Sequence, residues 1–160
     1  MNSFFPLVYL TLIIIFLFII LIFVLAEIFS IQILQKQIKA LKIKIDLRQA
    51  SLDTYTSLGQ IFLQKQRYSD AIEIYRKCLL KWNKNDKVGL VHIYMAISLA
   101  YSKLTIFDFA QIYLEQSIFN VPTCILALNN IVYIYKQRSF YKKYIETLIY
   151  IDKLTLKNNK

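Results

Sequence analysis

The sequence has few of the residues that build loops and hold metals. Its 160 residues include two glycines, two prolines, two cysteines and one histidine. Phosphate-binding loops of nucleotide enzymes need at least two closely spaced glycines, whereas Gly59 and Gly89 lie far apart. Cys78 and Cys124 lack CxxC spacing and, with His92 alone, cannot complete a zinc site. We therefore predict no metal site, no cofactor and no nucleotide-loop enzyme.

Acidic residues are also scarce: the sequence has ten Asp and Glu against twenty Lys and Arg, which gives a net charge of +10. The acids are scattered, and a catalytic triad would rest on His92 alone, so we predict no catalytic residue and no enzyme. The charge favours an anionic neighbour such as lipid or an acidic protein face. A sequence this rich in Ile and Lys is also what an A+T-rich genome encodes, which would leave the charge without a function. No nucleic-acid-binding module is visible, and we expect no nucleic-acid partner.

A long apolar run opens the chain. No charged residue occurs from Phe4 to Ala26, and at about 1.5 Å per residue this helix would cross a hydrocarbon core of about 30 Å. Val24 and Ala26 would suit a signal-peptide cleavage site, but the apolar run is too long and Met1–Ser3 carries no basic residue. We predict an uncleaved transmembrane helix over residues 4–26.

Basic residues follow this segment and none precedes it, so the positive-inside rule keeps the C-terminal part on the side of synthesis, the cytoplasm or an organelle stroma. These residues are Lys36, Lys39, Lys42, Lys44 and Arg48. Residues 27–51 lack glycine and proline and are predicted to form a basic amphipathic linker helix. A short heptad pattern of isoleucine and leucine over residues 31–52 suits docking on the following domain or oligomerisation.

A repeated pattern begins at Leu52, taken as position 1. It has aromatic residues at positions 4 and 11, leucine at 7, small residues at 8, 20 and 27, and a bulky residue at 24. Small residues let two antiparallel helices approach closely, and the pattern is that of the tetratricopeptide repeat (TPR). The residues are Tyr55, Leu58, Gly59, Phe62, Ala71, Tyr75 and Cys78.

Two further copies follow, predicting an all-α TPR solenoid over residues 52–157 with repeats near 52–85, 91–124 and 125–157. The second copy carries Tyr94, Ser98, Tyr101, Ala110 and Pro122. It is offset by 39 residues instead of 34, which we interpret as an extended loop around Trp82–Lys87. The third copy is degraded, because Val132 and Tyr144 occupy positions that should be small. Terminal repeats are commonly atypical.

The first helices of such repeats line a concave groove suited to an extended peptide or a partner helix. Chaperone-type repeats that bind a C-terminal carboxylate have Lys and Asn where this chain has Thr56 and Gln60, which argues against that activity. The C-terminal basic stretch, residues 136–160, could face anionic lipid or serve as a solubilising tail. The predicted groove lining is Asp53, Thr56, Gln60, Leu63, Gln64, His92, Met95, Leu99, Ser102, Lys103, Leu126, Asn129, Tyr133, Lys136 and Gln137.

The span from Phe4 to Ala26, followed by a basic linker and about three repeats, resembles the photosystem I assembly proteins of the plastid and cyanobacterial family called hypothetical chloroplast reading frame thirty-seven. The resemblance implies a single-pass thylakoid protein whose repeats face the stroma and assist assembly or stability of photosystem I. Its partners would be photosystem I subunits or assembly intermediates. The weak third repeat, and Asn83 where the pattern has proline, depart from that family.

Two other classes share this plan. An organelle import or fission receptor joins an anchor to helical repeats, and a bacterial membrane-anchored TPR protein can act as an envelope scaffold. The encoding genome separates them: plastid DNA supports the photosystem assembly protein, nuclear DNA the receptor, and a bacterial chromosome the scaffold.

Overall fold

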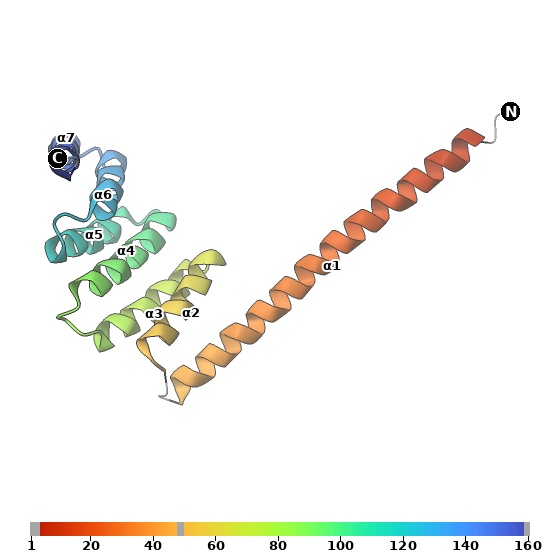
Figure 1. The fold of residues 1–160 in the computed structure, drawn as a ribbon, viewed down its shortest axis with the longest axis horizontal. Coiled ribbons are helices and arrows are strands. Elements are labelled where there is room, and N and C mark those ends of the chain that lie inside the picture. Colours follow the sequence, from red (N-terminus) through yellow and green to blue (C-terminus); the bar gives the residue numbers. More distant parts are fainter. Residues whose placement is uncertain (1–3, 48–49, 159–160) are drawn as a thin grey trace. The chain divides into compact units, whose positions relative to one another are not determined.

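The computed structural model describes residues 4–47 and 50–158, and within these ranges every regular element is an α-helix (Figure 1). The predicted all-α class is confirmed. Residues up to Ile43 form one compact unit and those from Lys44 onward a second, and each is described by itself. Met1–Ser3, Arg48 and Lys160, which entered the predictions above, lie outside the described residues.

The first unit is built on one unbroken helix, α1 (Phe4–Asp46). The segment Val8–Ile45 is long and apolar enough, by length and composition, to cross a membrane, and the side chains of residues 8–33 are all exposed. The helix ends at Asp46, before the linker boundary predicted at residue 51. The next helix has its own N-cap at Ser51, whose hydroxyl accepts a hydrogen bond from the Thr54 N–H at 3.3 Å.

Three antiparallel helix pairs make up the second unit, each helix packing against the next along the chain (Figure 1). The pairs correspond to the three predicted repeats. Their bounds are α2 (Leu52–Gln64) with α3 (Tyr68–Lys81), α4 (Lys87–Lys103) with α5 (Phe107–Asn120), and α6 (Ile125–Gln137) with α7 (Tyr141–Asn158).

All three first helices end in the same backbone cap. Gln66, Thr105 and Ser139 stand at position 15 of their repeats and have φ values of 58°, 61° and 57°. In each repeat the N–H of the following residue donates to a carbonyl five residues earlier at 2.9 Å, as in the Schellman motif. The third pair, whose sequence pattern is degraded, therefore turns at the same backbone corner as the other two.

Small residues allow the two helices of each of the first two pairs to pack closely. A Cβ added to Gly59 would lie 2.7 Å from the ring of Tyr75, so α2 and α3 have no room for a side chain there. In the second pair, the buried Ser98 hydroxyl donates to the Ala110 carbonyl oxygen across the helices at 2.9 Å. Ala71 and Ala110, at position 20, are completely buried.

The loop predicted around Trp82–Lys87 is present at residues 82–86, but most of the offset of the second repeat comes from an additional helical turn at the start of α4. Helix α4 has 17 residues, whereas α2 and α6 have 13 each. The turn begins at Lys87, where the Asp86 carboxylate accepts a hydrogen bond from the Gly89 N–H at 2.9 Å. A Cβ at Gly89 would clash with Trp82, so glycine lets the indole pack over this new turn.

The third pair is packed differently, as its large residues predict. Val132 and Tyr144 stand where the first two repeats have a small buried residue, and both are half-buried. No described side chain of α7 is buried. The core of this end comes instead from α4, α5 and α6, in a cluster of Val91, Met95, Ala110, Leu114, Ala127, Ile131, Ile134 and Tyr135.

Candidate binding groove

The residues predicted to line a groove come from α2, α4 and α6, and most of their side chains reach the surface. Thr56 is half-buried, and its hydroxyl donates to the Asp53 carbonyl oxygen at 3.1 Å. Met95 is buried in the core cluster and offers little to a partner. The exposed members are Asp53, Gln60, Gln64, His92, Leu99, Lys103, Leu126, Asn129, Tyr133, Lys136 and Gln137.

Four of the predicted lining residues, from α4 and α6, meet at one small cavity of about 150 Å³. Leu99 and Tyr133 are 48% and 51% exposed, so apolar surface is available to a ligand at its mouth. A cavity of this size holds a group about as large as a benzene ring. Its lining consists of Ser98, Leu99, Ser102, Lys103, Leu114, Asn130 and Tyr133.

The chemistry of this cavity suits a protein ligand. The Ser98 hydroxyl already donates to a backbone carbonyl, which leaves the Ser102 hydroxyl and the Asn130 amide to bond a peptide backbone. The Lys103 ammonium at the rim favours an acidic group. The cavity therefore has the polarity to accept one apolar side chain of a peptide and to orient its main chain.

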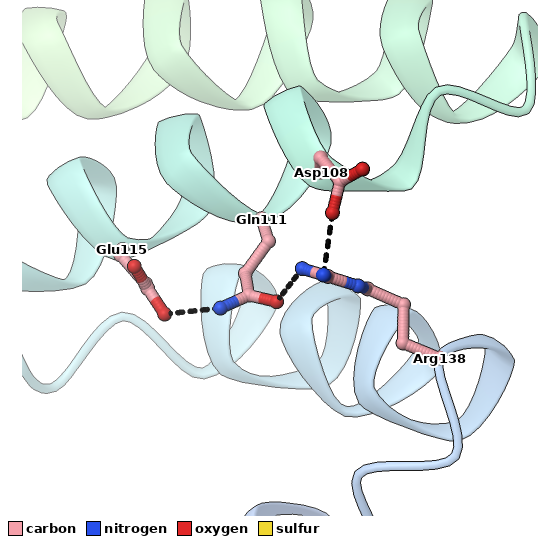
Figure 2. A network of polar contacts seen from close by, with 4 residues as sticks. All are labelled: Asp108, Gln111, Glu115 and Arg138. Carbon is pink, nitrogen blue, oxygen red and sulfur yellow. Dashed lines mark hydrogen bonds and ion pairs between the residues drawn. The ribbon is translucent and has the colours of Figure 1, made fainter.

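A polar network fastens α6 to α5 and so fixes one wall of the cavity (Figure 2). The Arg138 guanidinium pairs with the Asp108 carboxylate and donates to the Gln111 side-chain oxygen. The Gln111 amide in turn donates to the Glu115 carboxylate at 2.7 Å. Arg138 follows α6 directly, so this chain of bonds holds the end of α6 against three successive turns of α5.

The network also affects Tyr135. Its hydroxyl lies 3.4 Å from the Glu115 carboxylate. Burial, and secondarily the negative charge and hydrogen bond of Glu115, raise the pKa of Tyr135 to about 12. The phenol is therefore a neutral donor at physiological pH, and it adds another link between α5 and α6.

Sequence reasoning missed Asn130 and the Arg138 network. Asn130 stands at position 6, outside the usual lining positions. Arg138 appeared only as one of several basic residues, because a pairing between residues 27 to 30 positions apart has no local sequence signal. The signal that could have found it is the polar Gln111 at a position where the first repeat has Ile72.

The assembled features define a class: an array of TPR-type helix pairs joined in one chain to a long apolar helix, which is the plan of a protein–protein scaffold. No family model matches the chain. It is 28% identical over 137 residues to the ycf37 protein of Guillardia theta, covering 86% of this chain and 77% of that one. It is 30% identical over 139 residues to the ycf37 protein of Cyanophora paradoxa, covering 84% and 80%. The chain belongs to the ycf37 family, as its sequence predicted.

Solved structures agree with this fold. The crystal structure of MamA superposes with a TM-score of 0.68 at 20% identity, covering 76% of this chain and 68% of MamA. MamA from Desulfovibrio magneticus RS-1 also gives 0.68, at 12% identity, covering 82% and 71%. At these identities the likeness concerns the fold alone. Fold and family together support a scaffold that works by contacts with other proteins.

Proposed function

We propose that this protein is a non-catalytic scaffold, anchored in the thylakoid membrane, that assists assembly or stability of photosystem I. The observation that carries the proposal is the combination in one chain of a membrane-length apolar helix with a helical-repeat array. The first helices α4 and α6 of that array offer Leu99, Lys103 and Tyr133 around a cavity. Membership of a family found in plastids adds support. A photosystem I subunit or assembly intermediate would occupy the groove.

The orientation follows from the lysines after the apolar helix. Lys36, Lys39, Lys42 and Lys44 favour retention on the side of synthesis, which places the repeats in the stroma of a plastid. Protease added to intact thylakoids should then digest residues 52–157 and leave a fragment of α1. Complete protection until the vesicles are lysed would contradict this orientation.

Co-purification tests the partner. The tagged full chain, solubilised in mild detergent, should recover photosystem I polypeptides. Leu99→Glu should reduce that recovery at least tenfold, because it places a charge on the apolar mouth of the cavity. Ile112→Glu is the matched control, since Ile112 is 50% exposed on α5 and does not line the cavity. Recovery of no photosystem I polypeptide, with normal photosystem I in a deletion strain, would reject the proposal.

A further inference from the structure

The last helix, α7, has an apolar face that is covered in the other two repeats. Ile145 and Leu148 stand at positions 21 and 24 of the third repeat and are 54% and 40% exposed. The equivalent residues of the second repeat, Gln111 and Leu114, are 8% and 1% exposed. Gln111 receives its bond from Arg138 and Leu114 packs with residues of α6, so the first helix of the next repeat provides the cover.

Further exposed side chains extend this face into a stripe along α7. Its members recur three, four or seven residues apart, which places them on one side of the helix. Together, Tyr141, Ile145, Leu148, Ile149 and Leu156 form what is called here the α7 stripe. Its length matches a surface that another helix would bury.

Charged residues along the α7 stripe indicate what kind of partner it would bind. Lys142, Lys153 and Lys157 follow one edge, with Glu146 among them, and all are exposed. Asp152 lies within the stripe, between Leu148 and Leu156. A bilayer would have to desolvate that carboxylate, which is costly, whereas a partner helix can pair it with a basic residue.

We propose that the α7 stripe binds an amphipathic helix of another protein, packed in the position that a fourth repeat's first helix would take. This helix has acidic residues facing Lys142 and Lys153 and a basic residue within its apolar face opposite Asp152. The inference goes beyond the proposed function, since the α7 stripe is separate from the groove formed by the first helices.

Segments of this chain are poorer occupants. The linker residues 31–45 are apolar on one side but carry four lysines, the same charge as the edge of the α7 stripe. Stacking of a second copy through α2 would present the acidic Asp53 and no basic residue of that helix to pair with Asp152. The charge pattern therefore favours an acidic partner over either.

Two designed peptides with the same Ala/Leu helical stripe provide the test. One has glutamates outside its stripe and one lysine within it; the other has these charges exchanged. Both are titrated against the full chain in phosphatidylcholine nanodiscs. The acidic peptide should bind at least tenfold more tightly than the basic one, because it complements both the lysine edge and Asp152.

Variants locate the binding. Ile145→Glu should weaken the acidic peptide at least tenfold, while Leu80→Glu, at an 88% exposed apolar residue of α3, should leave it unchanged. Lys153→Glu, which alters no packed side chain, should narrow the difference between the two peptides. Equal binding of both peptides, or no effect of Ile145→Glu in a variant of unchanged circular dichroism, would overturn the proposal.

Two further measurements address the other occupants. Slower hydrogen exchange of residues 141–157 in phosphatidylglycerol nanodiscs than in phosphatidylcholine, with exclusion of the peptide, would overturn the proposal in favour of lipid. Dimerisation that Ile145→Glu abolishes would overturn it in favour of a second copy. Either result leaves recovery of photosystem I through the groove unaffected, so the two proposals fail separately.

Discussion

The second and third repeats have the same backbone corner between their two helices but differ in how those helices pack. Both first helices close with a left-handed residue and the same 2.9 Å backbone hydrogen bond, at Thr105 and Ser139. The second pair then joins through the buried Ser98 and Ala110, whereas the third has the half-buried Val132 and Tyr144. The comparison teaches that backbone capping defines the hairpin, and that small side chains decide how closely its helices pack.

The largest expected difference in stability between the two repeats concerns the leucine at position 24. Leu114 is 1% exposed and Leu148 is 40% exposed. Leu114→Ala should lower the free energy of unfolding by about 3 kcal/mol, since it leaves a cavity in the core. Leu148→Ala should cost less than about 1 kcal/mol, because most of its side chain already contacts solvent. Urea unfolding of the full chain in detergent, followed by Trp82 fluorescence, measures both; equal losses would contradict the comparison.

Substitutions at position 8, Gly59 in the first repeat and Val132 in the third, should show the next largest difference in stability. Gly59→Leu should destabilise the protein by about 2 kcal/mol, since even a Cβ would lie 2.7 Å from the Tyr75 ring. Val132→Leu at the same position of the third repeat is the control and should cost well under half of that. Thermal unfolding followed by circular dichroism compares the two variants with the wild type. An unchanged midpoint for Gly59→Leu would refute the close approach of α2 and α3.

The shared corner predicts a smaller, stabilising effect. Thr105 is β-branched and has φ 61°, a conformation that glycine adopts without strain. Thr105→Gly should therefore increase the free energy of unfolding by about 1 kcal/mol. Ser57→Gly, at an exposed position inside α2, should instead reduce it by about 0.5 kcal/mol. Urea midpoints of the two variants that move in the same direction would argue against the cap.

The smallest effect at neutral pH is expected at Tyr135. Its folded pKa of about 12 exceeds the ordinary value of 10.0, so its contribution to stability is complete below pH 10 and is lost as the pH rises towards 12. Tyr135→Phe should leave stability at pH 7 nearly unchanged and reduce the steepness of the alkaline loss. Tyr75, whose pKa burial also raises to about 12, accounts for part of the remaining slope. An identical pH profile for the variant would refute the shift.

The sequence was sufficient to predict the all-α class and the long apolar helix, because an uncharged run and the spacing of large and small side chains both indicate helices directly. Helix ends were harder. The corners use Gln66, Thr105 and Ser139 in place of glycine, and most of the offset of the second repeat comes from a longer helix. Of the groove, the exposed Leu99, Lys103 and Tyr133 were predicted from their positions. Arg138 and its partners were not, since their contacts join distant parts of the chain.

The corner formed by Gln66, Thr105 and Ser139 is specified by main-chain geometry, and several different residues can occupy it. The residues at the signature positions can therefore be substituted while the helical hairpins persist, provided that each corner keeps its two backbone hydrogen bonds. Such substitutions leave the shape of the array unchanged, in keeping with a chain that shares its fold with MamA at 20% identity.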